Sequence, residues 1–372
     1  MFTNNNQKKL TLFLIIIIGL VLRWLFPLDR LFDFDQNQIA EFSKQIIEKN
    51  LTLIGPRTGP LQFFTGPLIY YLGAIIYKLT NLHPIANTYI SLSIYLLTIF
   101  SLLIIFKNKF TFFFRTTFIA LYSLSPYFIQ LDRVTWNPNL SFLSGSLVLM
   151  SLLYYQKQNP LKSYAFGFLG MFLAYQAHFS GFIMLVIALI LSLIFHKSIK
   201  FIVSTISGLL ISLSSLIIFD LRNNWLNLRG LLAMLSNSEQ VGKVSLFARL
   251  YKNITITLEN LGKILIYNSN FISLSLIGLI ILTVWFKSES KFLTKKQKSI
   301  TLLWSILFAI LFALYRGQTP EYYFLMQPPA FFIVIADLLS KYHKKISHMF
   351  YYQAYYLQFR WEQSYPLVLQ TV

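Results

Sequence analysis

Residues 86–106 read ANTYISLSIYLLTIFSLLIIF and contain no charged side chain. A helix that crosses a bilayer needs about 20 mostly apolar residues, so this segment predicts a membrane span. Similar stretches occur along the whole chain, at 10–26, 112–130, 138–155, 164–177, 180–196, 201–219, 271–286, 300–315 and 324–340. The sequence therefore predicts an all-α, polytopic integral membrane protein with about ten transmembrane helices.

The overall composition supports this prediction. Of the 372 residues, 56% are hydrophobic and only 12% are charged, whereas soluble domains carry about 25% charged residues. This excludes a soluble enzyme and a disordered chain. The absence of cysteine excludes disulfides, thiolate metal sites and a cysteine nucleophile.

The basic residues predict the topology. Residues 66–79, GPLIYYLGAIIYKL, are apolar but too short for a span, and they suit a helix lying at the membrane surface. If they do not cross, one side of the membrane collects seventeen basic residues and one acid, Glu289, whereas the other side holds 13 basic and 10 acidic residues. The basic side has Lys8, Lys9, Lys107, Lys109, Arg115, Lys157, Lys162, Lys197, Lys200, Lys287, Lys291, Lys295, Lys296, Lys298, Lys341, Lys344 and Lys345. Such asymmetry marks the cytoplasmic side, so the net charge of +19 reflects topology and nucleic-acid binding is not expected.

This topology places a multi-pass protein in the cell (plasma) membrane with its N-terminus in the cytoplasm. Residues 1–345 form the transmembrane domain, and 346–372 form a cytoplasmic tail without an evident role. The two long loops, 27–85 and 220–270, lie outside. Because loops carry most functional sites, we expect an active site on the outer face.

The first outer loop contains the strongest catalytic candidates. Asp33 and Asp35 precede an amphipathic segment that is expected to form a surface helix. Asp35 with Gln38 three residues later resembles a capping box, so one interpretation makes Asp35 a helix N-cap. The other makes it a general base held at the lipid–water boundary.

Other polar residues need a role on the outer side. His178 lies between two spans, and an ionisable residue at that depth is a functional candidate, although a structural role is an alternative. Arginines that could contact a phosphate are Arg57, Arg133, Arg222 and Arg316. Local ion pairs are the simpler alternative for three of them, through Asp132–Arg133, Asp220–Arg222 and Arg316–Glu321.

Four stretches in this order resemble the C-type glycosyltransferases, in particular the bacterial relatives of the dolichyl-phosphate-mannose–protein mannosyltransferases, which include the lipid A aminoarabinose transferase. Asp35 to Glu41, DQNQIAE, is similar to the family's Asp-Glu-x-x-x-Ala-Glu start of the first outer helix. Residues 66–71, GPLIYY, resemble its Pro-Pro-Leu-x-Tyr-Trp surface helix. The other two are 132–139, DRVTWNPN, which includes Asn137, and 175–178, YQAH. Two positions depart from the family pattern. Gln36 stands where the family usually has a second acid, and Thr65–Gly66 stand where a family member has a lysine before Pro-Pro-Leu.

The resemblance implies an activity. A hexosyl- or pentosyltransferase of this kind would take a sugar from a polyprenyl-phosphate donor and transfer it, with inversion, to an acceptor lipid, glycan or protein. Asp35 would be the base, with Asp33 as the alternative, and the arginines would offset charge on the leaving phosphate. Glu41, Asp132, Asn137, His178 and Glu321 are further site candidates. No cofactor is required by the pattern, and a divalent metal is compatible with it.

A transporter or flippase of lipid-linked saccharides is the alternative function. It would share the basic inner face and the outer arginines. It would more often show paired broken helices and repeat symmetry, and we detect no internal repeat in this sequence.

Overall fold

The computed structural model describes residues 5–28, 32–58, 63–107, 110–155, 160–236, 244–266, 271–290, 292–315, 317 and 319–341. Within these ranges the chain is α-helical, and the β-structure is an isolated bridge between Arg57 and Phe64. The expected tail, 346–372, and Arg316 lie outside the described residues.

Each predicted span coincides with helical structure, and two further helices lie within the expected long loop 220–270. The helices are α1 (Asn5–Trp24), α2 (Phe34–Ile47), α3 (Leu68–Leu79), α4 (Ala86–Phe106), α5 (Phe112–Leu124), α6 (Pro126–Arg133), η1 (Asn137–Leu140), α7 (Ser141–Tyr154), α8 (Leu161–Ala177), α9 (Gly181–Phe195), α10 (Ile199–Arg222), α11 (Leu226–Ser236), α12 (Leu246–Leu265), α13 (Phe271–Lys287), α14 (Lys295–Leu314) and η3 (Glu321–Phe324). A last helix covers residues 328–341.

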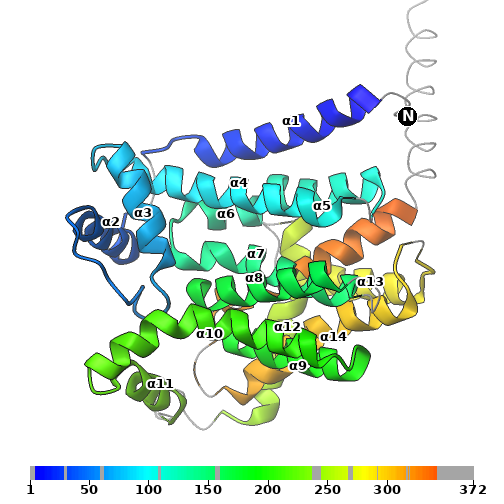
Figure 1. The fold of residues 1–372 in the computed structure, drawn as a ribbon. Helices are drawn as coiled ribbons and strands as arrows, with labels where there is room; N and C mark the ends of the chain where they lie inside the picture. The colour runs from blue at the N-terminus through cyan, green and yellow to red at the C-terminus, as the bar shows by residue number, and fades with distance from the viewer. Residues whose placement is uncertain are drawn as a thin grey trace, which may run out of the picture.

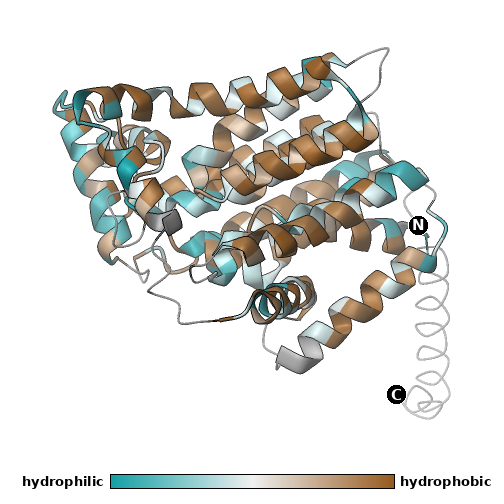
Figure 2. Cartoon of the chain, turned by 90° about the horizontal axis from the view of Figure 1, so that it is seen from below, coloured by the Kyte–Doolittle hydropathy of each residue, from teal (hydrophilic) through white to brown (hydrophobic). Residues whose placement is uncertain are grey.

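The apolar helices make this a multi-pass membrane protein. By length and composition, α4, α10 and α14 can each cross a bilayer, and shorter apolar helices include α3, α5 and α9. Figure 2 shows apolar residues along the long helices and polar residues gathered toward the ends of the bundle. The ten predicted spans each coincide with a helix or helix pair. Within the described residues, three of these helices meet the length and hydropathy expected of a full crossing.

Three helices outside the long bundle gather at one of its ends. In Figure 1, α2, α3 and α11 lie at the left-hand end, whereas α1 begins at the opposite end. We call this the Asp35 end, because Asp35 lies in the first turn of α2. The helix α3 has 12 residues and packs against α2. Its length agrees with the predicted short helix, and its position relative to the membrane stays a prediction.

The third predicted span is broken. The helix α5 ends at Leu124, and α6 begins at Pro126. Proline has no backbone N–H to donate within the helix and clashes with the preceding turn, so the break follows directly from the sequence. The fourth span starts with the short η1, in which Pro138 occupies an early position.

The centre of the bundle is formed by α7, whose residues from Ser141 to Leu153 are buried. It packs mainly against α8, which packs in turn against α10. At the second contact, a Cβ on Gly208 would lie 2.2 Å from the carbonyl oxygen of Phe168. The missing side chain allows α8 and α10 to approach closely, as small residues do between membrane helices.

Candidate functional site at the Asp35 end

The first turn of α2 differs from the expected capping arrangement. Asp33, rather than Asp35, is the N-cap, and Gln36 accepts from the backbone N–H of Asp33 at 3.0 Å. The expected Asp35–Gln38 capping box was therefore wrong. The cap lies two residues earlier because Asp33 adopts the extended backbone conformation that an N-cap requires. Asp35 is left in the first helical turn without the capping role.

The carboxyl group of Asp35 is exposed at the start of α2 but sits beside protein on one side. Its pKa is raised above the usual value, first by partial desolvation and then by the negative charge of Asp33. A raised pKa brings a carboxylate closer to the range useful for proton transfer at neutral pH.

Gln36 joins α2 to the segment that follows α6. Its amide donates to the carbonyl oxygen of Thr135 at 2.7 Å, and the side chain is 1% exposed. The hydroxyl of Thr135 donates to the carbonyl oxygen of Asn87 at 2.6 Å, at the start of α4. Gln36 therefore has a positioning role here: it holds the start of α2, and with it Asp35, against the bundle.

Five aromatic side chains lie next to this anchor: Trp136, His178, Phe179, Tyr322 and Tyr323, which we call the aromatic cluster. The Trp136 and Tyr322 ring centroids are 5.1 Å apart, and the His178 ring lies 4.6 Å from that of Tyr323 and 5.7 Å from that of Tyr322.

The charge of Asp35 acts on Tyr322 of the aromatic cluster. Burial raises the pKa of the Tyr322 phenol, and the charge of Asp35 raises it further. The structure thus brings together Asp35, the segment after α6, the α8–α9 turn and η3, which are far apart in the sequence.

His178 is held in a defined orientation in the turn between α8 and α9. Its Nδ1 accepts from the backbone N–H of Ser180 at 3.2 Å and lies 3.0 Å from the Ser180 hydroxyl. Burial lowers the pKa of the imidazole to about 3, so the ring is neutral at pH 7. A cationic role at this position is therefore not supported.

Asn137 connects three parts of the site. Its amide donates to the carbonyl oxygen of Ala177, at the end of α8, and to the hydroxyl of Thr65 at 3.3 Å. Nearby, Gln176 accepts from the backbone N–H of Leu68 at 3.0 Å and donates to Ser212. The hydrogen bonds of Asn137 and Gln176 therefore hold the segment that leads into α3 against the bundle.

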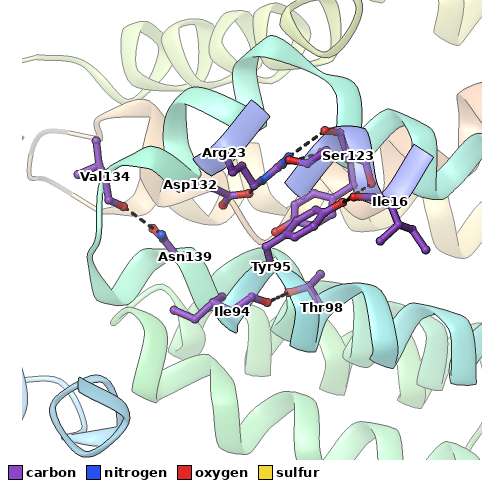
Figure 3. Close-up of polar contacts among 11 residues, drawn as sticks. Ile16, Arg23, Ile94, Tyr95, Thr98, Ser123, Asp132, Val134 and Asn139 are labelled. Carbon is purple, nitrogen blue, oxygen red and sulfur yellow. Dashed lines mark hydrogen bonds and ion pairs between the residues drawn. The ribbon is translucent and has the colours of Figure 1, made fainter. Parts of the chain in front are cut away.

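The predicted local pair between Asp132 and Arg133 was wrong. Asp132 pairs instead with the buried Arg23 of α1, with 2.7 Å between Oδ2 and Nε, as Figure 3 shows. The guanidinium also donates to the carbonyl oxygens of Gly19, Ser123 and Tyr122. The last two acceptors lie where α5 ends before Pro126, so Arg23 satisfies backbone groups that the broken helix leaves without helical partners.

The acids of the other two predicted ion pairs, Asp220 and Glu321, contact other groups. Asp220 accepts from the backbone N–H groups of Asn227 and Leu228, at 2.6 and 3.0 Å, and so begins α11 rather than pairing with Arg222. Glu321 pairs with Lys263 of α12, which also contacts Glu259 at 2.9 Å. Arg316 lies outside the described residues, so its predicted pair with Glu321 stays a prediction. Each partner comes from another helix or from the backbone, which spacing in the sequence does not reveal.

The predicted phosphate ligands occupy separate places. Arg57 is exposed in the bridge with Phe64, Arg133 donates to the carbonyl oxygen of Leu25 at 2.9 Å, and Arg222 is exposed at the end of α10. Arg316 is outside the described residues. Their role as donor ligands stays a prediction.

Glu41 is exposed on α2, one and a half turns after Asp35, and lies 3.5 Å from the amide of Gln45. Among the residues that the structure describes, no three His, Asp or Glu side chains form a group that could hold a metal ion.

Sequence reasoning missed Arg23, Tyr322, Tyr323 and Lys263. The signal for Arg23 was present, since it is an ionisable residue within the first predicted span. The two tyrosines were hidden because aromatic residues are frequent throughout this chain.

Comparison with known proteins supports the fold. No family model matches, and no curated protein matches by sequence. Among solved structures, ArnT from Cupriavidus metallidurans bound to undecaprenyl phosphate is similar, with a TM-score of 0.63 and 15% identity over 91% of this chain. The apo form of the same protein gives a TM-score of 0.60, 16% identity and 87% coverage of this chain. The chain has an ArnT-like helical membrane fold, and the alignments cover 62% and 59% of the ArnT chains.

Proposed function

We propose that the protein transfers a sugar from a polyprenyl-phosphate donor to an acceptor, with Asp35 as general base. The observation that carries this proposal is the position of Asp35. It does not cap the helix, its pKa is raised, and its charge acts on Tyr322 of the aromatic cluster. The fold of ArnT, a lipid A aminoarabinose transferase that has been crystallised with undecaprenyl phosphate, supports the donor class.

The chemistry assigned to Asp35 is proton removal. A nucleophilic hydroxyl of the acceptor loses its proton to the carboxylate as it attacks the anomeric carbon, and the bond to the phosphate oxygen breaks. The electron pair leaves with the polyprenyl phosphate, and in-line attack inverts the anomeric centre. Cationic groups among Arg57, Arg133, Arg222 and Arg316 would offset the charge on the departing phosphate.

We place this reaction on the outer face of the cell membrane, with the N-terminus in the cytoplasm. The argument is the basic asymmetry of the loops, together with the position of α2, α3 and α11 at the end opposite the start of α1. Reporter fusions after residues 110, 160 and 198 should read cytoplasmic, and a fusion near residue 50 should read external. A cytoplasmic signal near residue 82 would mean that α3 crosses the membrane.

The test of the catalytic role uses Asp35→Asn. Purified protein is incubated with a panel of undecaprenyl-phosphate sugars, and release of undecaprenyl phosphate is measured. Loss of a general base should lower turnover by roughly 10²–10⁴-fold. The same variant should not be destabilised, because a carboxyl whose pKa is raised by folding disfavours the folded state once it is ionised.

Asp33→Asn is the matched control. It keeps an N-cap oxygen at the same helix, so it should reduce turnover much less. Near-normal turnover of Asp35→Asn would refute the assignment, and loss in Asp33→Asn alone would move the base two residues upstream. A lipid-linked saccharide that crosses vesicles without release of polyprenyl phosphate would instead favour the flippase.

A further inference from the structure

We infer that His178 and the aromatic cluster form the sugar-binding part of the site, with the imidazole Nε2–H donating to a sugar hydroxyl. This inference rests on the proposed function and deepens it, because it names the residues that would recognise the transferred group.

The hydrogen bonds of His178 determine which nitrogen carries the proton. The backbone N–H of Ser180 can only donate, so Nδ1, 3.2 Å away, must accept. In a neutral imidazole the other nitrogen then bears the hydrogen. His178 is therefore a neutral donor through Nε2.

This donor has no protein acceptor within the described part of the chain. The hydrogen bonds of His178 involve Nδ1 and the backbone. The side chain is nevertheless deep in the fold, where the residue is 4% exposed. Nε2 itself is not one of the fully buried side-chain atoms that lack a partner, so this donor can be reached from solvent and can meet an acceptor on a bound ligand.

The surroundings of His178 indicate the kind of acceptor. The rings of Trp136, Tyr322 and Tyr323 are partly exposed and lie next to it. Aromatic faces pack against the C–H faces of a sugar ring, while a nearby neutral donor pairs with one of its hydroxyl groups. A phosphate would instead favour a cationic donor, and burial keeps this imidazole uncharged.

The position of the aromatic cluster also suits transfer. Tyr322 contacts both Trp136 and His178, and its phenol responds to the charge of Asp35. A sugar lying on Tyr322 would therefore lie next to the imidazole, on a residue that the charge of the proposed base also affects.

Two substitutions of His178 distinguish loss of the Nε2–H donor from a general disturbance of the fold. In His178→Gln the side-chain amide supplies an N–H near the Nε2 position, and in His178→Asn an oxygen can still accept near the Nδ1 position but the Nε2 donor is lost. Affinities are measured in detergent for undecaprenyl phosphate and for undecaprenyl phosphate carrying mannose, glucose or an aminopentose. Loss of one neutral hydrogen bond should weaken binding by roughly two- to tenfold.

His196→Asn is the matched control. His196 is also a buried histidine, but it ends α9, which starts three residues after His178, and it lies against Tyr155 and Lys296. The 15 residues of α9 place it about 22 Å away along the helix. This variant should bind every lipid as the unmodified protein does.

The expected result is that His178→Asn weakens binding of the preferred sugar-bearing lipid, leaves undecaprenyl phosphate unchanged, and is rescued by His178→Gln. Equal loss for both kinds of lipid, no loss at all, or an unmodified protein that does not distinguish sugar-bearing lipid from undecaprenyl phosphate would overturn the inference. If Asp35→Asn abolishes turnover while His178→Asn binds normally, transfer stands and this inference fails. If no lipid is turned over but His178→Asn selectively weakens binding of the sugar-bearing lipid, this inference stands and the proposed transfer fails.

Discussion

The buried pair between Arg23 and Asp132 provides the sharpest stability prediction. Arg23→Met would leave the carboxylate of Asp132 buried beside an apolar side chain, and it would remove the donors that serve the carbonyl oxygens of Tyr122 and Ser123. Removing one partner of a buried ion pair costs about 3–5 kcal/mol. We expect Arg23→Met to fall in this range, since Arg23 is 0% exposed.

Asp132→Asn should cost less, about 1.5–3 kcal/mol, because the amide oxygen can still accept from the guanidinium. The double variant should be less destabilised than the sum of the two, by at least about 1 kcal/mol, since each single change already removes the contact between the two charged side chains. The free energy of unfolding can be measured by reversible denaturation with dodecyl sulfate in mixed micelles.

Arg133→Met is the control for this cycle. Arg133 is adjacent in sequence but partly exposed, and it donates to the carbonyl oxygen of Leu25, so it should cost less than about 1 kcal/mol. Additive losses in the Arg23 and Asp132 variants, or a cost of Arg23→Met no larger than that of the control, would refute the reasoning.

Three further predictions concern the Asp35 end. Gly66→Ala should destabilise the protein by about 1–3 kcal/mol, because the new Cβ would lie 2.2 Å from the Oε1 atom of Gln176, which is held by other hydrogen bonds; adding Gln176→Ala should recover part of the loss in the same micelle assay. Glu321→Gln should cost only about 0.5–1 kcal/mol, since its side chain is 44% exposed beside Lys263, and a loss above 2 kcal/mol would contradict this. Turnover should fall as pH drops through the pKa of Asp35, so the acidic limb should lie above the ordinary value of 3.8; a limb at or below 3.8 would argue against Asp35 as the base.

The sequence predicted those features that depend on local composition. Apolar length located the helices, and the Ser125–Pro126 step explains why the third one breaks. The shortness of the apolar run at residues 66–79 predicted a short helix, and the structure has the 12-residue α3 there. The family-like stretch around Asp35 placed the proposed base at the start of a surface helix, and the structure has that helix.

The sequence did not predict the cap, because both Asp33 and Asp35 are followed three residues later by a glutamine, Gln36 and Gln38. Because both pairs have the same Asp-x-x-Gln spacing, the sequence alone cannot tell which aspartate caps the helix. The tertiary contact separates them, since Gln36 also donates to the carbonyl oxygen of Thr135 and is thereby turned toward the bundle.

Ion-pair partners were decided by the tertiary structure alone. Asp132 had an arginine next to it in sequence, yet its partner is Arg23, 109 residues away. A neighbour in the same helix competes poorly with a group on a facing helix when the facing group must be buried and needs a charge partner. His178 shows the same limit, because its neutral state and the direction of its free N–H depend on what the bundle packs around it. Composition and hydrophobic length thus determined that the chain crosses a membrane as helices, whereas the packing of those helices decided which polar groups pair with one another to hold them together.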